Sequence, residues 1–184
     1  MDLDKAIKDR HSTRKFKDKK PSWKKIIECM DAMRYAPMAG NNSTLKLILV
    51  DDSDKINKIA EACQQQFIAT AKYVVVACSN PSLPKNAYGD RAEVYVRQQA
   101  GAAIQNFLLK IQETGLATCW VGSFVEEHIK RELKIPANIQ IEAVFPIGFE
   151  FEKTKKRLKI DMDSILYFNA FGNKKKKKIK KLDV

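Results

Sequence analysis

Apolar residues recur at helical spacing in several stretches of the chain, and short apolar runs alternate with them. In the stretch between Ser22 and Pro37, Ser22 is a candidate N-cap. Pro37 ends this stretch, because the residue before a proline avoids the α region. The stretch 51–54 offers an N-cap for the third helix. We therefore expect helices over residues 2–9, from Ser22 to Pro37, from 51–54 to about Cys63, over 92–113 and over 125–133.

The longest of these predicted helices, roughly 92–113, is apolar nearly all the way round. Ala102 and Leu109 lie off its main apolar stripe, so we expect the helix to be central in the fold. Gly115 suits the C′ position that ends it. The main stripe consists of Ala100, Ala103, Ile104, Phe107, Leu108 and Ile111.

Four apolar runs predict strands over residues 45–50, 73–78, 117–121 and 139–149. Between the second strand and the long helix, residues 80–92 carry two prolines and a glycine with little periodicity, which is typical of a surface excursion or lid. A last short apolar segment covers 164–171. Helices that interleave with strands, with one dominant helix, indicate an α/β or α+β layer fold.

The size and composition favour one globular domain. The chain has 184 residues, of which 45% are hydrophobic and 30% charged. The longest unbroken apolar run, 73–78, is too short to span a bilayer, and the first ten residues lack the apolar region of a secretory signal. The four cysteines lie far apart without a C-x-x-C pair, which predicts reduced, core-filling thiols in a cytoplasmic protein.

The net charge of +12 is concentrated at the C-terminus. Residues 173–184 hold seven lysines and one aspartate, which is half of the excess. We expect residues 1–172 to form the domain and 173–184 a flexible lysine-rich tail. Without aromatic residues or an amphipathic face, the tail predicts non-specific electrostatic binding at most, and neither a specific nucleic acid nor a membrane as a partner.

Several catalytic patterns are absent from the sequence. It has no G-x-G-x-x-G, no phosphate-binding P-loop and no G-x-S-x-G, and neither His11 nor His128 neighbours a plausible nucleophile. Two histidines do not support a His-rich metal centre, so we expect no metal. Cys119 lies in a predicted strand between Thr118 and Trp120, where packing is the better interpretation. No side chain is expected to act as a catalytic nucleophile.

Three clusters carry possible chemistry. The sequence R-H-S-T-R at 10–14 places two guanidinium groups and two hydroxyls at a helix end, which could grip a phosphate. The sequence A-P-M-A-G-N-N at 36–42 combines a helix stop with small residues that let the backbone approach a ligand. The sequence G-L-A-T-C-W-V-G-S-F at 115–124 is a strand that ends in a Gly-Ser turn, whose backbone N–H groups are free to meet an acceptor.

Together, in this order and spacing, the clusters resemble the FMN-dependent nitroreductase family from about residue 3 to residue 172. The sequence P-I-G-F at 146–149 fits the same pattern. The resemblance implies an α+β fold with a central, mostly antiparallel sheet flanked by helices. It also implies an intertwined homodimer with FMN at the interface.

The resemblance assigns cofactor-binding roles to particular residues. Arg10, His11 and Ser12 would hold the flavin phosphate and ribityl chain, and Arg14 would lie at the N1/C2 edge of the ring. Arg157 fits the late basic residue that meets the phosphate, with Lys155 and Lys159 as competitors for that role. Gln64 would face the pyrimidine ring. The other implied contacts are Pro37, Met38, Ala39 and Asn41 from the second subunit, and Trp120, Val121, Gly122 and Ser123 beside the ring, with the Gly122 N–H toward N5.

The implied activity is an NAD(P)H oxidoreductase with a ping-pong mechanism. FMN takes hydride from NADH or NADPH at N5 and passes it to a small acceptor such as a nitroaromatic or a quinone. Dehalogenation, enoate reduction and flavin breakdown are alternatives within the same resemblance, and a non-enzymatic flavin-binding or polyanion-binding protein is an alternative outside it. The family often has Gln-Pro-Trp where this chain has Ser43-Thr44-Leu45, and Ala-Pro where it has Ala71-Lys72, which bears on subfamily and substrate.

Overall fold

The computed structural model describes residues 1–152 and 158–174. By its internal contacts the chain divides into two units, Met1–Thr154 and Lys155–Val184. Arg157 and Lys155, two of the residues considered for the phosphate, lie outside the described residues. The domain boundary expected at residue 172 stays a prediction.

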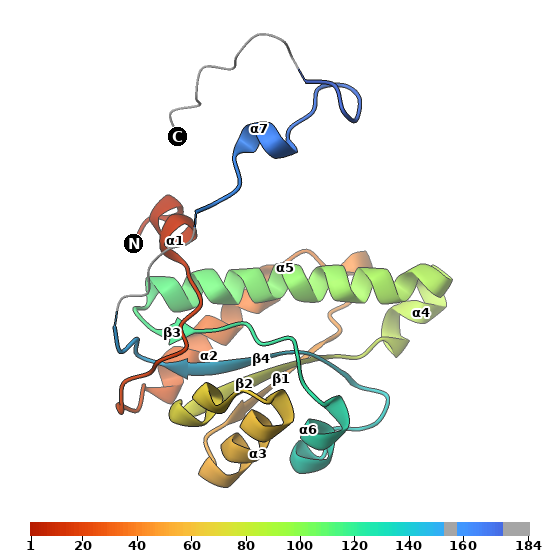
Figure 1. Ribbon diagram of the computed structural model, residues 1–184. Coiled ribbons are helices and arrows are strands. Elements are labelled where there is room, and N and C mark those ends of the chain that lie inside the picture. Colours follow the sequence, from red (N-terminus) through yellow and green to blue (C-terminus); the bar gives the residue numbers. More distant parts are fainter. Residues whose placement is uncertain (153–157, 175–184) are drawn as a thin grey trace. The chain divides into compact units, whose positions relative to one another are not determined.

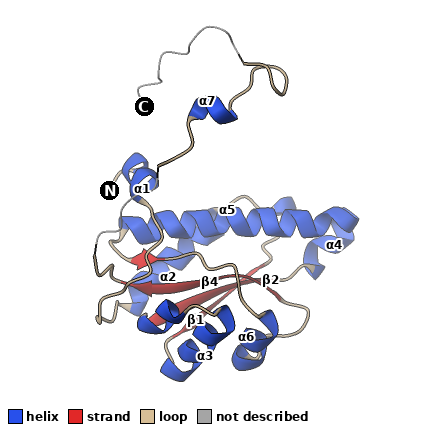
Figure 2. Cartoon of the chain, in the orientation of Figure 1, coloured by secondary structure: helices blue, strands red, loops and turns tan. Residues whose placement is uncertain are grey.

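A four-stranded antiparallel sheet forms the centre of the first unit (Figure 2). The strand order is β1-β2-β4-β3, with bounds Leu45–Val50, Tyr73–Ser79, Gln140–Gly148 and Ala117–Thr118 for β1, β2, β4 and β3. Every residue of β2 is buried, as its unbroken apolar run predicts for a strand with both faces covered.

Helices cover both faces of this sheet (Figure 1). Tyr73, Val75 and Ala77 of β2 pack with α2 and α5, whereas Val74, Val76 and Cys78 pack with α3 and α6. Successive side chains of a strand point to opposite faces, so one apolar run serves two cores. The covering helices are α2 (Trp23–Asp31), α5 (Ala92–Glu113), α3 (Ser53–Cys63) and α6 (Glu126–Leu133).

The long helix α5 has the predicted bounds, and Gly115 follows its end with a φ of +74°. Ala103, Ile104 and Phe107 lie in the core against the sheet, while Val94 is exposed. The helix therefore lies along the sheet with one face buried in its own chain. The remaining apolar positions are covered only partly within the described residues.

The other predicted helices agree with the structure at their core positions. The helices 2–9 and 51–63 correspond to α1 (Leu3–Asp9) and α3, and the Asp52 carboxylate caps α3 by accepting from the N–H of Asp54 and Lys55. The helix that Pro37 ends consists of α2 and a 3₁₀ turn, η1 (Ala32–Tyr35). Ser22 occupies the N-cap position of α2, but its side chain makes no capping hydrogen bond.

One prediction needs correction, and the structure adds detail to another. The expected strand 117–121 is shortened to β3 at 117–118, followed by a single bridge between Val121 and Val144, because the intervening residues leave the ladder. The surface excursion or lid expected at 80–92 is largely helical, with α4 (Ser82–Tyr88) and a 3₁₀ turn η4 (Gly89–Arg91) leading into α5. Two further 3₁₀ turns, η2 (Ala39–Asn41) and η3 (Gln66–Thr70), lie in connecting segments.

All four cysteines are buried free thiols, which confirms that they fill the core. Burial raises the pKa of Cys63 and of Cys78 to about 12, since the thiolate would lose its hydration there. These two side chains therefore stay uncharged at neutral pH and are poor nucleophiles.

In the described part of the second unit, residues 158–174, there is one short helix, α7 (Met162–Ile165), where the sequence predicts an apolar segment at 164–171. The Tyr167 and Phe171 rings pack against each other, and the Lys174 ammonium lies 4.1 Å from the centre of the Tyr167 ring. None of the helices in the described ranges is both long and apolar enough to cross a bilayer.

Candidate functional site

The segment that follows α1 is bound to the end of the sheet by backbone hydrogen bonds. The Thr13 N–H donates to the carbonyl of Thr118 in β3 at 2.9 Å. Farther along, the Lys17 N–H donates to Phe149 at 2.8 Å and the Phe151 N–H to Lys15 at 3.0 Å. The R-H-S-T-R cluster is thereby placed beside the 115–124 and 146–149 motifs.

Close packing fixes the same segment. The ring of Phe16 lies directly over Gly148, so that a Cβ added to Gly148 would stand 2.8 Å from Phe16 Cδ1. Phe16 also packs with Ala71 and Ala117. The glycine of the 146–149 motif is therefore required here by a close approach of a side chain within the chain itself.

A cavity of about 210 Å³ lies between this segment, β3 and the C-terminal end of α5. We call it the arginine pocket; its polar lining consists of Arg10, His11, Thr13, Gln112, Thr118 and Glu150. The His11 ring contacts the Glu150 carboxylate at 2.6 Å through Nε2 and the carbonyl of Asp9 at 2.8 Å through Nδ1. Both partners are acceptors, so both contacts are hydrogen bonds at once only when the ring carries two N–H groups.

Two polar groups of the arginine pocket are unsatisfied. The Thr118 hydroxyl is buried and has no hydrogen-bond partner among the described residues. The Arg10 guanidinium has no hydrogen bond or ion pair within the described part of the chain. An unpaired cation and an unpaired buried hydroxyl together suit an anionic ligand that also carries oxygen acceptors.

Ser12 and Arg14 do not line this pocket. Arg14 is exposed, and in residues 1–152 and 158–174 its guanidinium contacts no acid. The described residues therefore give no support to a role for Arg14 in a surface ion pair.

The segment 120–123 runs along the edge of the sheet beyond β3. Val121 and Val144 exchange two backbone hydrogen bonds of 3.0 Å, and the Trp120 ring packs 6.0 Å from that of Phe145. Trp120 is nevertheless 41% exposed. A Cβ on Gly122 would meet only Trp120 Nε1, at 3.9 Å, so the backbone at Gly122 is open to close approach by another molecule.

Gln64 lies near this edge. It ends α3 in a left-handed conformation, with a φ of +53°, and its side chain is exposed. The Val125 N–H donates to the carbonyl of Ala62 at 2.8 Å, which brings the residues after Ser123 to the same end of α3.

The segment 36–42, which we call the proline loop, lies elsewhere on α5. Pro37, Met38 and Ala39 line an open pocket of about 470 Å³ together with Tyr95, Gln98, Gln99 and Ala102 of that helix. Asn41 is exposed and has a φ of +57°. The proline loop thus contacts the N-terminal half of α5, whereas the arginine pocket lies at its C-terminal end.

The structure therefore separates the expected site residues into two groups. Gln99 beside the proline loop and Gln112 in the arginine pocket are thirteen residues apart on one helix, which at about 1.5 Å per residue is roughly 20 Å. One group consists of residues 10–14, 120–123 and the end of α3, and the other of residues 37–41. Lys159, which is described, is exposed in the second unit.

Sequence reasoning missed several polar residues of the site, Gln112 of the arginine pocket among them. Glu150 and Thr118 line the arginine pocket, and Gln99 binds the proline loop. A signal existed only for Gln99, which is a polar residue on the apolar stripe that also holds Val96 and Ala103. Glu150 and Thr118 depend on pairing with residues more than a hundred positions away.

The comparisons with known proteins decide the family. The model of the nitroreductase family matches residues 7–72 and 59–149. A relative from Archaeoglobus fulgidus, named provisionally as an NADH dehydrogenase/NAD(P)H nitroreductase, is 31% identical over 150 residues, which is 79% of this chain and 83% of the relative. The chain belongs to the nitroreductase family.

Solved structures of nitroreductases agree with this membership. A nitroreductase family protein from Clostridium novyi NT is 27% identical, with a TM-score of 0.76, and the match covers 94% of this chain and 96% of the other. An FMN-dependent nitroreductase from Clostridium difficile is 25% identical, with a TM-score of 0.77, covering 90% and 98%. The predicted nitroreductase fold is confirmed.

Proposed function

We propose that the protein is an FMN-dependent NAD(P)H oxidoreductase that reduces a small acceptor, such as a nitroaromatic or a quinone, by a ping-pong mechanism. Membership of the nitroreductase family, and the similarity to a solved FMN-dependent nitroreductase and to an NAD(P)H nitroreductase, confirm the predicted enzyme class and FMN as cofactor. The acceptor and the order of steps are the proposed part.

The observation that carries the proposal is the unsatisfied polarity of the arginine pocket. Arg10 supplies a guanidinium without a partner among the described residues, and Thr118 a buried hydroxyl without one. FMN offers an anionic phosphate and a hydroxylated ribityl chain, which match these groups. We assign the phosphate end to Arg10 and His11 of this pocket and to Ser12 between His11 and Thr13.

The ring end of FMN is assigned to the edge of the sheet beyond β3. The open backbone at Gly122 lets a flat ring approach closely, and we assign the Gly122 N–H to the flavin N5. Trp120, Val121 and Ser123 lie along the same edge. Arg14 is placed at the N1/C2 edge and Gln64 at the pyrimidine ring. An exposed guanidinium that contacts no acid is available to stabilise negative charge on a ligand.

A homodimer is proposed to complete the site. The proline loop lies about 20 Å along α5 from the arginine pocket of its own chain, so Pro37, Met38, Ala39 and Asn41 are assigned to the flavin bound by the partner. An apolar groove of about 350 Å³ between α1 and α5, lined by Leu3, Tyr35 and Leu109, gives a second copy a surface to cover.

Bound FMN would supply the hydride chemistry, as a flavin does in other oxidoreductases. The chain's own residues have other tasks. Arg10 and His11 anchor the phosphate, Arg14 balances charge at the ring edge, and the partner's proline loop excludes water from one side of the site. The helical segment α4–η4, where the sequence predicts a lid, is assigned to the acceptor side.

The test is an anaerobic assay of NADH and NADPH oxidation against a panel of nitroaromatic and quinone acceptors. Yellow protein whose absorbance bleaches with NAD(P)H and recovers with acceptor supports the proposal, and parallel double-reciprocal plots support the ping-pong order. Colourless protein that binds no added FMN would overturn it. Sedimentation of a flavin-loaded monomer at micromolar concentration would overturn the shared site.

A further inference from the structure

One buried side chain of α5 connects the proline loop to the sheet. Gln99, only 5% exposed, accepts a hydrogen bond from the Ala39 N–H at 3.1 Å through Oε1. Through Nε2 it donates to the Thr44 hydroxyl at 2.6 Å. Both ends of the amide are therefore used, and no apolar side chain of the same size can replace these bonds.

The loop that Gln99 holds has an unusual backbone. Gly40 and Asn41 are successive residues with φ values of +59° and +57°. Glycine and asparagine adopt this left-handed region more readily than other residues, and contacts from outside the loop add to its hold. Besides Gln99, Tyr88 of α4 approaches the loop closely. Its hydroxyl lies 2.7 Å from the position that a Cβ on Gly40 would occupy.

The other partner of Gln99 is itself fixed. Thr44 is fully buried, and its carbonyl accepts from the Asn80 N–H at 2.9 Å, directly after β2. The neighbouring Ser79 hydroxyl donates to Glu142, a side chain of β4 that is 8% exposed and lies at a bulge opposite Ala77 and Cys78.

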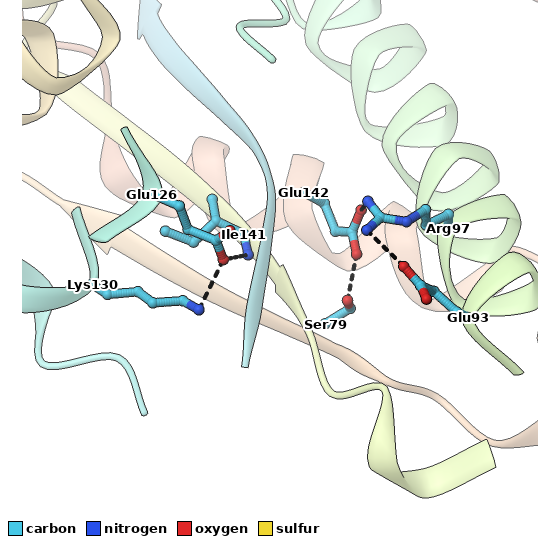
Figure 3. A network of polar contacts seen from close by, with 7 residues as sticks. All are labelled: Ser79, Glu93, Arg97, Glu126, Lys130, Ile141 and Glu142. Carbon is cyan, nitrogen blue, oxygen red and sulfur yellow. Dashed lines mark hydrogen bonds and ion pairs between the residues drawn. The ribbon is translucent and has the colours of Figure 1, made fainter. Parts of the chain in front are cut away.

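Figure 3 shows the Glu142 carboxylate between Ser79 and Arg97 of α5. Arg97 also pairs with Glu93 at 3.0 Å. The same view shows Glu126 of α6 on the other side of β4, where it accepts from the Ile141 N–H and pairs with Lys130. The ends of β2 and β4 are thus held by polar contacts from both helical layers, so Thr44 is a firm anchor for Gln99.

We propose that Gln99 is a positioning residue for the cofactor: it fixes the Ala39 backbone so that the proline loop can close on FMN. The proposal rests on the function proposed above, in which residues 37–41 contact the flavin of the partner subunit. Gln99 acts through Ala39, and Thr44 acts through Gln99.

The test compares four variants of the full chain. Gln99→Met removes both hydrogen bonds while keeping the length of the side chain. Thr44→Val removes only the anchor of Gln99, and Thr44→Ser restores the hydroxyl. Gln105→Met is the matched control, because Gln105 is an exposed residue of the same helix.

Two measurements are made on each variant. FMN affinity is measured by quenching of flavin fluorescence, below the melting temperature of every variant. Exchange of the Ala39 amide hydrogen is measured by NMR on the protein without FMN, which needs no cofactor and no activity.

We expect Gln99→Met to weaken FMN binding about tenfold, as for one buried hydrogen bond left unmade, and to accelerate exchange at Ala39 by a similar factor. Thr44→Val should weaken binding about threefold, and Thr44→Ser and Gln105→Met by less than twofold. If Gln99→Met does not fold, Thr44→Val and Thr44→Ser are compared instead, by FMN affinity and by exchange of the Ala39 amide hydrogen.

Three results would overturn the proposal: FMN affinity unchanged in Gln99→Met, a loss of the same size in Gln105→Met, or no recovery in Thr44→Ser. They are distinct from failure of the proposed function, in which the unchanged protein would bind no FMN at all. If the unchanged protein binds no FMN, the proposal for Gln99 fails together with the proposed function. Faster exchange at Ala39 in Gln99→Met would then still report the hydrogen bond between Ala39 and Gln99.

Discussion

The arginine pocket and the proline loop are both assigned to FMN, but they are held in different ways. Residues 10–17 pair with the sheet through several backbone hydrogen bonds, and Phe16 packs closely on Gly148. The proline loop has left-handed residues and depends on the amide of Gln99 and a contact with Tyr88. The first region is thus bound to the end of the sheet through its backbone, whereas the second depends on two side chains of neighbouring helices.

Replacing Arg10 by alanine should give the largest effect on the cofactor. The change removes a charge-assisted contact to phosphate worth about 1.5–3 kcal/mol, so FMN affinity should fall about 10- to 150-fold. The melting temperature without FMN should stay the same, because Arg10 has no partner to lose within the described residues. Titration with FMN and a thermal melt of the cofactor-free protein test both statements, and a large loss of stability would contradict them.

Replacing Gly148 by alanine should destabilise the protein at the end of the sheet that holds the arginine pocket. The new methyl would meet Phe16, whose backbone is held at the end of β4, so overpacking should lower the free energy of unfolding by about 1–3 kcal/mol. Denaturant unfolding measures the effect. Gly122→Ala is the matched control, since its methyl would make only an ordinary contact with Trp120 at 3.9 Å, and equal stability losses in both variants would contradict the packing argument.

Replacing Arg14 by alanine should change the redox potential more than the affinity. Negative charge develops at the N1 edge only on reduction, so losing the cation should lower the midpoint potential of bound FMN. The expected drop is about 30 mV, which is about 1.4 kcal/mol for a two-electron couple. Spectroelectrochemistry measures it alongside Arg10→Ala, whose potential should move less. An unmoved potential in Arg14→Ala would show that the guanidinium lies elsewhere.

Removing the lysine-rich end should have the smallest effect. Truncation after Lys174 keeps the contacts of Asn173 and Lys174 with residues 163–168 and removes only the residues beyond them. Electrostatic screening acts over about 8 Å at physiological salt, so kcat/KM for a neutral acceptor should stay within about twofold. A tenfold loss would make the tail a part of the site.

The sequence by itself determined the elements and the family. An unbroken apolar run located β2, a run interrupted only by Lys46 located β1, and helical periodicity located α5, with Gly115 just beyond its end. These signals are local, because they depend on the period of side chains along one helix or strand. The ordered set of motifs pointed to the nitroreductase family, which its family model confirms.

Only the tertiary structure decided how those motifs meet. Residues 10–17 join the sheet through partners more than a hundred positions away, such as Thr118 and Phe149, and the same kind of pairing creates the pocket with Glu150. The apolar sequence 117–121 predicted a longer strand, but regular pairing with β4 ends at Thr118. Tertiary packing set the roughly 20 Å between the arginine pocket and the proline loop, because the two segments pack against different halves of α5. Such distances and pairings depend on the packing of elements remote in sequence, and no local pattern encodes them.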